Sequence, residues 1–183
     1  VLPAILRKIH LAKLLEKDDW NSIRCDLRGN PISDIESGDS SEKILKVLNN
    51  FGIQFDKNQQ KSHVQLWGTG KAMREFLHVD DMAAASIFVL ELDKKSYQKK
   101  TKTMLSHINI GTGVDVTIQE LAECIKNILG YEGQISFDYS KPDGSPRKLI
   151  DVSLLTKIGW RSKIGLEEGI KRTYEKYLSN ITK

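Results

Sequence analysis

The stretch WGTGKAMREFLHVDD, residues 67–81, combines residue types that can bind a phosphate and a base. Arg74 carries a planar guanidinium that is always charged and suits bidentate phosphate recognition. Trp67 offers a flat aromatic face on which a base could stack. In the alternative interpretation, Trp67 belongs to the hydrophobic core and Arg74 pairs with Glu75 or a nearby aspartate. The residue chemistry alone leaves both interpretations open.

The glycines of this stretch do not complete either common phosphate-binding loop. A Walker A loop needs a glycine where Gln65 stands and a serine or threonine where Ala72 stands. A dinucleotide-binding fingerprint needs a third glycine where Met73 stands, and a helix should open there. The spacing therefore favours a plain turn between two strands.

A second cluster, KPDGSPRK at residues 141–148, could also hold an anionic ligand. Two of its cations could bind a diphosphate, and Asp143 could accept hydrogen bonds from sugar hydroxyls. Its two prolines stiffen the loop, and a stiff loop loses less entropy when it closes on a ligand. The alternative is an ordinary surface turn.

The other titratable residues predict no catalytic or metal centre in this chain. The histidines at 10, 63, 78 and 107 share no metal-ligand spacing. Asp80 and Asp81 stand at a predicted helix start, where carboxylates stabilise the helix, so we expect capping there. Cys25 and Cys124 match neither a metal site nor a redox pair, which fits a reduced, cytoplasmic setting.

Composition narrows the partners that we expect. The 183 residues are enough for one ordinary domain or two small ones. The net charge of +4 is far from the dense basic stripe of a nucleic-acid-binding protein. No run approaches the roughly 20 apolar residues that span a bilayer, so we expect no membrane partner. The chain has no initiator methionine and starts at the approach to a helix, so we expect a fragment.

Patterning predicts a mixed α/β architecture. Residues 2–15 predict a helix, and residues 16–62 predict an insertion that is mostly loop, with one helix capped by Ser40 or Ser41. Asp80, Thr117 and Ser153 are expected to cap three later helices, and Glu120 completes a capping box with Thr117. The remaining predicted elements are strands at 63–68, 73–79, 105–111 and 134–138, a basic loop at 97–103, and a last amphipathic helix at 166–178.

Several stretches together resemble one family. Residues 1–10, 66–86, 105–125 and 130–160 and the last predicted helix are similar to the C-terminal half of the GDP-L-fucose synthases. These belong to the extended short-chain dehydrogenase/reductases and act as NADPH-dependent 3,5-epimerases and 4-reductases on GDP-4-keto-6-deoxy-mannose. The strings GTGKAMREFLHVDD and KPDGSPRK are the most specific part of the resemblance.

The resemblance implies an α/β fold, namely the C-terminal substrate-binding part of such an enzyme, with a few elements that belong to the Rossmann sheet. It implies a helix at 1–15 that enters the substrate domain, an insertion at 16–62 and a nucleotide-sugar-binding region at 63–183. It also implies that Trp67 and Arg74 line the GDP-sugar pocket and that Asp143 and Lys148 contact the substrate. Lys8 falls where the family commonly has a substrate-binding arginine.

The departures from the family are equally informative. The glycine-rich NADP-binding turn, the Tyr-x-x-x-Lys pair and the epimerising cysteine and histidine do not occur here, so the NADP-binding domain is expected outside this chain. We therefore expect the chain alone to be inactive, and the full-length enzyme to be a cytoplasmic homodimer that uses NADP. The alternatives are the substrate domain of another nucleotide-sugar epimerase or dehydratase, and a stand-alone nucleotide-binding module.

Overall fold

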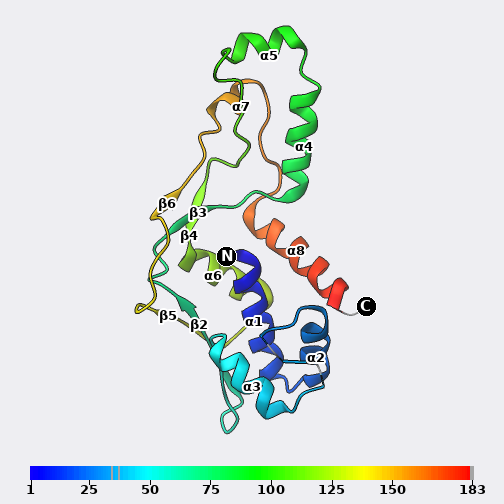
Figure 1. Cartoon of the computed structure of the whole chain (residues 1–183), viewed down its shortest axis with the longest axis vertical. Coiled ribbons are helices and arrows are strands. Elements are labelled where there is room, and N and C mark those ends of the chain that lie inside the picture. The colour runs from blue at the N-terminus through cyan, green and yellow to red at the C-terminus, as the bar shows by residue number, and fades with distance from the viewer. Residues whose placement is uncertain (34, 37, 182–183) are drawn as a thin grey trace.

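The computed structural model describes residues 1–33, 35–36 and 38–181 and has the mixed α/β fold that the sequence predicts (Figure 1). The helices are α1 (Leu2–Glu16), α2 (Trp20–Gly29), α3 (Ser41–Asn50), α4 (Val79–Leu90), α5 (Lys94–Lys100), α6 (Ile118–Leu129), α7 (Ser153–Lys157) and α8 (Leu166–Ile181). The strands are β1 (Ile53–Asp56), β2 (Lys61–Trp67), β3 (Met73–Glu75), β4 (Asp115–Thr117), β5 (Gln134–Asp138) and β6 (Arg147–Lys148).

Two small sheets meet at the turn between β2 and β3. In the first, the strand order is β1-β2-β5, with β1 antiparallel and β5 parallel to β2. In the second, the order is β4-β3-β6, with β4 antiparallel and β6 parallel to β3. The turn at residues 68–72 therefore carries the chain from one sheet to the other, which confirms the prediction of a turn between two strands.

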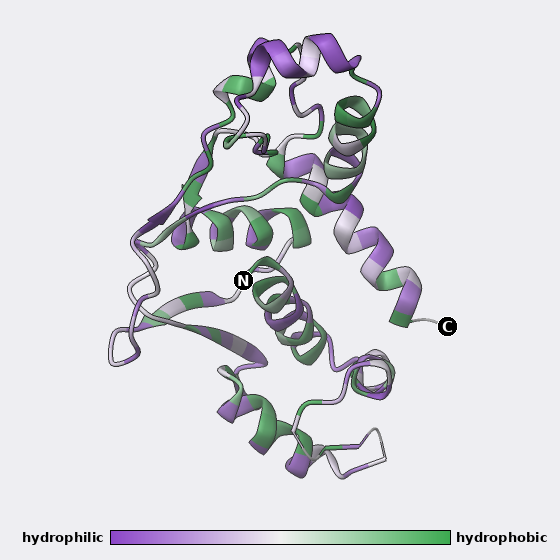
Figure 2. Ribbon diagram, turned by 45° about the horizontal axis from the view of Figure 1, so that its top comes forward, coloured by the Kyte–Doolittle hydropathy of each residue, from purple (hydrophilic) through white to green (hydrophobic). Residues whose placement is uncertain are grey.

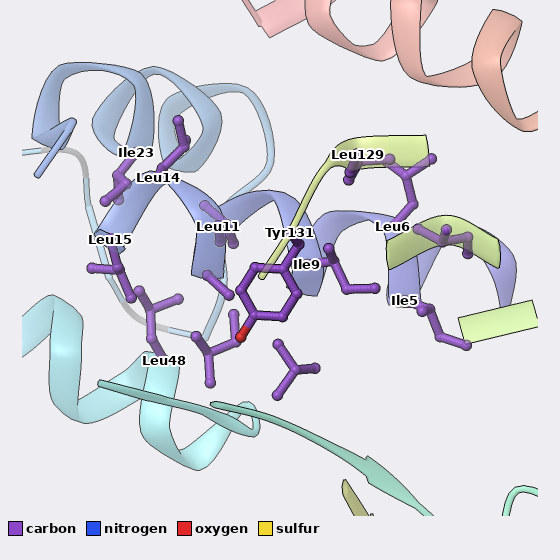
Figure 3. Close-up of a cluster of buried hydrophobic side chains, with 14 of the residues drawn as sticks. Ile5, Leu6, Ile9, Leu11, Leu14, Leu15, Ile23, Leu48, Leu129 and Tyr131 are labelled. Atoms are coloured by element: carbon purple, nitrogen blue, oxygen red, sulfur yellow. The ribbon is translucent and has the colours of Figure 1, made fainter. Parts of the chain in front are cut away.

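Helix α1 is the centre of the lower lobe, which consists of α1, α2, α3, α6 and the β1-β2-β5 sheet (Figure 1). Pro3 stands in its first turn, where a missing N–H costs nothing. Figure 3 shows Leu11, Leu15, Leu48 and Tyr131 as members of one cluster of buried side chains. The Tyr131 hydroxyl meets the Ser62 hydroxyl at 2.9 Å, so this polar atom is satisfied inside the core.

The prediction of loop structure at the start of the insertion is wrong, because α2 occupies residues 20–29. Asp19 caps this helix by accepting a hydrogen bond from the Ser22 amide at 3.0 Å. Ile23 and Leu27, four residues apart, are both buried in the core. The helix was missed because its third buried residue is the charged Asp26, which breaks the apolar pattern.

Several other local predictions need correction. β1 was not predicted, and α5 lies over part of the predicted basic loop. The strand predicted at 105–111 has no ladder beyond a single bridge at Leu105, since no neighbouring strand lies beside it among the described residues. The caps also differ: His78 caps α4 in place of Asp80, and Val152 precedes α7 in place of Ser153.

The upper arm consists of residues 77–111 and 149–165, including α4, α5 and α7 (Figure 1). Its small core contains Ala85, Leu155 and Trp160. Figure 2 shows α4 as largely hydrophobic and α5 as largely hydrophilic. Much of the apolar surface of α4 is not covered: Leu90 is 83% exposed and Ile87 is 56% exposed.

Candidate substrate-binding pocket

A pocket of about 390 Å³ lies between the start of α1, the turn after β2 and the loop that follows β5. Four of the five predicted substrate-binding residues line it: Lys8, Trp67, Arg74 and Asp143. The rest of the lining is mainly apolar or glycine: Val1, Ala4, Ile5, Leu66, Gly70, Ala72, Ile118, Pro142 and Gly144. An apolar pocket with a few convergent polar groups is typical of a small-molecule site.

The two glycines of the turn serve close packing. Gly68 and Gly70 have φ values of 83° and 75°, a backbone region that favours glycine. A Cβ on Gly68 would lie 2.2 Å from Asp143 Oδ1, and one on Gly70 would lie 2.6 Å from the Phe137 ring. Gly68 therefore lets the 139–146 loop approach the turn, and Gly70 lets the Phe137 ring of β5 approach it.

Arg74 lies in the pocket without a carboxylate partner among the described residues. Its Nη1 donates to the carbonyl oxygens of Met73 at 2.6 Å and Ser145 at 2.7 Å. The Glu75 carboxylate instead accepts hydrogen bonds from the Gly113 amide at 2.7 Å and the Ile150 amide at 3.0 Å. The alternative in which Arg74 pairs with Glu75 is therefore wrong, and the guanidinium keeps its charge for a ligand.

Trp67 is a surface residue at the pocket rim. It is 70% exposed, so the alternative that places it in the core is wrong. The ammonium nitrogen of Lys141 lies 5.6 Å from its ring centroid, within the range of a cation–π interaction. The sequence had placed Lys141 in the basic cluster, and the structure adds its contact with the aromatic face.

Asp143 fastens the 139–146 loop to the turn. Its carboxylate accepts hydrogen bonds from the Thr69 amide at 2.8 Å and the Thr69 hydroxyl at 2.5 Å. These bonds lower the pKa of Asp143, because they stabilise the charged form. Thr69 is a pocket-shaping residue that the sequence did not identify, and no local pattern links it to a partner 74 positions away.

Lys148 lies outside the pocket lining. It is the strand partner of Arg74 in the β3–β6 ladder and is exposed. Its neighbour Arg147 forms a bidentate ion pair with Asp115, with Nε–Oδ2 at 2.6 Å. Lys148 therefore adds positive charge next to Arg74 without contacting the pocket.

Lys8 belongs to α1 and lines the pocket from that helix. Its ammonium donates to the Gln65 carbonyl at 3.2 Å and lies 4.8 Å from the centroid of the Phe51 ring. Burial lowers the pKa of Lys8 from its ordinary value. Among the described residues, no carboxylate forms an ion pair with it.

The other residues considered for chemistry, His10 and the aspartates at 80–81, make contacts that hold the fold together. His10 is buried, and its Nδ1 lies 2.9 Å from the Tyr174 hydroxyl. Asp81 is buried and accepts hydrogen bonds from the amides of Lys163 and Ile164 at 2.9 and 2.8 Å. It ties α4 to the segment before α8, so the two aspartates at 80–81 do not form an acid/base pair.

Within residues 1–33, 35–36 and 38–181, no helix combines the length and apolar content that crossing a bilayer requires. No group of three or more His, Cys, Asp or Glu residues there could hold a metal ion.

The chain is similar to known proteins along most of its length. Residues 35–111 match the NAD dependent epimerase/dehydratase family. Over 67% of the chain, the GDP-L-fucose synthase of Escherichia coli (strain K12) is 56% identical, and the match covers 38% of that protein. The chain therefore spans little more than a third of the length of this curated relative.

Two solved structures from Campylobacter jejuni match almost the whole chain. A GDP-6-OMe-4-keto-L-xylo-heptose reductase is 42% identical, with a TM-score of 0.82, over 98% of this chain and 47% of that one. A GDP-D-glycero-L-gluco-heptose synthase, determined in the presence of NADPH, is 41% identical with a TM-score of 0.81 over 97% of this chain and 47% of that one. The chain is thus similar to the NAD dependent epimerase/dehydratase family over residues 35–111 and to about a third of a GDP-L-fucose synthase.

Proposed function

We propose that the full-length protein is an NADP-dependent GDP-L-fucose synthase that converts GDP-4-keto-6-deoxy-mannose to GDP-L-fucose. This chain supplies its GDP-sugar-binding part, with the insertion at 16–62 and the binding region at 63–183. The observation that carries the proposal is the pocket in which Lys8 and Arg74 present positive charge without carboxylate partners. The 56% identity to a GDP-L-fucose synthase supports the same assignment.

Each pocket residue has a role that fits its chemistry. Arg74 and Lys8 bind the substrate diphosphate, and Trp67 stacks on the guanine at the rim. Asp143 holds the 139–146 loop over the ligand and accepts hydrogen bonds from hydroxyls with its remaining lone pairs. Lys148 strengthens the positive potential beside Arg74. Holding the sugar in one orientation is the contribution that this part makes to the reaction.

The catalytic residues and the NADP site lie outside this chain. The turn at 68–72 leads into a strand and carries no dinucleotide fingerprint, so no step of hydride transfer is assigned to these residues. NADP, when bound by the other part of the enzyme, supplies or accepts the hydride. The chain alone is inactive, and the full-length enzyme is a cytoplasmic homodimer.

A second candidate function is reduction of the 4-keto group of a GDP-heptose. The solved heptose-modifying enzymes match 97–98% of the chain, whereas the GDP-L-fucose synthase of E. coli matches 67%. The additional part that they match is about as long as the predicted insertion at 16–62. The more extensive match to the heptose-modifying enzymes favours a GDP-heptose as the substrate.

Two measurements on the full-length protein test these proposals. GDP should raise the melting temperature more than UDP or dTDP does, and equal protection by UDP or dTDP would indicate another nucleotide-sugar epimerase or dehydratase. NADPH oxidation should then be compared with GDP-4-keto-6-deoxy-mannose and with a GDP-4-keto-heptose. Faster turnover of the heptose would select the second candidate. GDP binding without turnover of either sugar would indicate a nucleotide-binding module.

A further inference from the structure

The predicted insertion contacts the pocket residue Lys8 through the corner Phe51–Gly52, which joins α3 to β1. The Gly52 carbonyl accepts a hydrogen bond from the Gln65 amide at 2.8 Å. The Gln65 carbonyl in turn accepts the Lys8 ammonium at 3.2 Å, and the Phe51 ring lies 4.8 Å from the same ammonium. The corner and Gln65 thus surround the end of the Lys8 side chain.

The backbone of this corner fits closely around Lys8. Gly52 has a φ of +88°, and a Cβ at this position would lie 2.6 Å from the Gln65 carbonyl oxygen and 3.0 Å from the Lys8 ammonium. Only glycine allows this approach without moving the backbone of β2. The preceding residue, Phe51, is the C-cap of α3. The end of the helix therefore fixes the backbone position from which the Phe51 ring extends.

An aromatic ring is a suitable support for a cation that must bind an anion. The ring attracts the ammonium through its quadrupole and carries no net charge. A carboxylate in the same place would fix Lys8 equally well but would cancel its charge. Because no described carboxylate pairs with Lys8, the ring and the Gln65 carbonyl hold it while its charge remains available.

We propose that Phe51 is a positioning residue for nucleotide-sugar binding, which holds the Lys8 ammonium toward the diphosphate of the substrate. The insertion then contributes to substrate binding through Lys8, although its own residues do not line the pocket. This inference rests on the proposed function, because it takes Lys8 as a ligand of the diphosphate.

A double-mutant cycle on the full-length protein tests the proposal, with GDP as the probe in isothermal titration calorimetry. Phe51→Leu removes the ring and keeps the apolar volume, so it should weaken GDP binding about threefold to tenfold. Phe51→Tyr retains the ring and should restore binding to near the wild-type value. The matched control is Phe55→Leu, in the adjoining strand β1, which should leave GDP affinity unchanged.

Lys8→Met completes the cycle. In the Lys8→Met background, Phe51→Leu should weaken GDP binding no further, because the cation that the ring supports is gone. With the GDP-sugar substrate, Phe51→Leu should raise KM and leave kcat unchanged. If Phe51→Leu lowers the melting temperature of the free protein severely, Phe51→Met is used in its place.

The outcomes separate the inference from the proposed function. An equal effect of Phe51→Leu with and without Lys8, or an equal effect of Phe55→Leu, would overturn the positioning role. So would normal GDP affinity in Lys8→Met. In each of these cases the wild-type protein still binds GDP, and the proposed function stands. Failure of the wild-type protein to bind GDP would overturn the proposed function itself.

Discussion

Arg74 and Lys8 present positive charge to one pocket, while the neighbouring carboxylates are bound elsewhere. Glu75 accepts hydrogen bonds from the amides of Gly113 and Ile150, and Asp143 accepts from Thr69. A cation near a protein surface interacts strongly with an opposite charge only if no other group already neutralises it. The engagement of these carboxylates therefore leaves the charges of Arg74 and Lys8 available to the diphosphate that we propose as their ligand.

At Arg74, we predict that replacement by lysine weakens GDP binding by about tenfold or more. Lysine keeps the charge, but it loses the planar fork that can hold two carbonyl oxygens and a phosphate together. The measurement is the Kd of GDP for the full-length variant. Arg147→Lys is the control, because Arg147 pairs with Asp115 and does not line the pocket. Equal losses of GDP affinity in the two variants would show that replacing either arginine disturbs the protein in general, and that Arg74 makes no specific contact with GDP.

His10 should make folding stability depend on pH. Burial lowers its pKa to about 4 from an ordinary value of 6.5. Between these values the unfolded chain binds a proton that the folded chain does not, so stability falls as pH decreases from 6.5 to 4 and changes no further below that. The loss attributable to His10 is at most about 3 kcal/mol.

The measurement that isolates His10 is urea denaturation at several pH values, with His10→Gln as the comparison. The variant should lose less stability than the wild type over this window, because glutamine does not titrate. The groups that face His10 remain the same in both proteins: Asp26, Asp19, Arg7 and Lys13 by charge, and Tyr174 and Tyr177 by ring contact. Parallel pH curves for the two proteins would show that another group is responsible.

The sequence predicted the residue types of the pocket better than their partners. Arg74 and Trp67 could be proposed because a guanidinium and an indole have specific uses. Their partners could not be predicted, because the carbonyl that Arg74 binds belongs to Ser145, 71 positions away. The Asp143–Thr69 contact joins residues 74 positions apart.

Helices whose start and end are both marked by capping residues in the sequence were predicted. Helices whose buried face depends on a partner elsewhere in the chain were missed. Helix α6 has a capping box between Thr117 and Glu120 and ends at Gly130 in the left-handed region, all of which the sequence indicates. Helix α2 instead buries Asp26, whose carboxylate is paired with Arg7 from α1 at 2.7 Å. No pattern within α2 could reveal that the charge would be neutralised.

For α2, we predict that Asp26→Asn destabilises the fold by about 3 kcal/mol or more, because removing one partner of a buried ion pair leaves the other uncompensated. Asp26 is fully buried, and its second oxygen accepts a hydrogen bond from the Tyr177 hydroxyl of α8. The substitution therefore weakens the contact among three helices. The free energy of unfolding in urea measures the effect. Asn21→Ala, an exposed change in the same helix, should alter it by less than about 0.5 kcal/mol.

Considered as a whole molecule, the chain has one well-filled lobe and one arm with uncovered apolar surface. The lower lobe surrounds α1 on several sides, whereas the upper arm has only a small core. The segment 105–111 reads as a strand in the sequence but has no sheet to join among the described residues. An apolar strand pattern reports that a segment is buried in a sheet, and it carries no information on which part of the protein supplies that sheet.

The exposed apolar surface of the arm leads to a prediction about the chain of residues 1–183 produced alone. Leu90 and Met104 are 83% and 90% exposed, and uncovered apolar patches drive association. We expect the isolated chain to self-associate with increasing concentration in sedimentation velocity. Leu90→Lys should reduce this association, because it places a charge on the apolar face of α4. Lys99→Gln, on exposed α5, is the control and should leave it unchanged. A chain that stays monomeric would contradict the prediction, and equal behaviour of the two variants would place the association surface elsewhere than on α4.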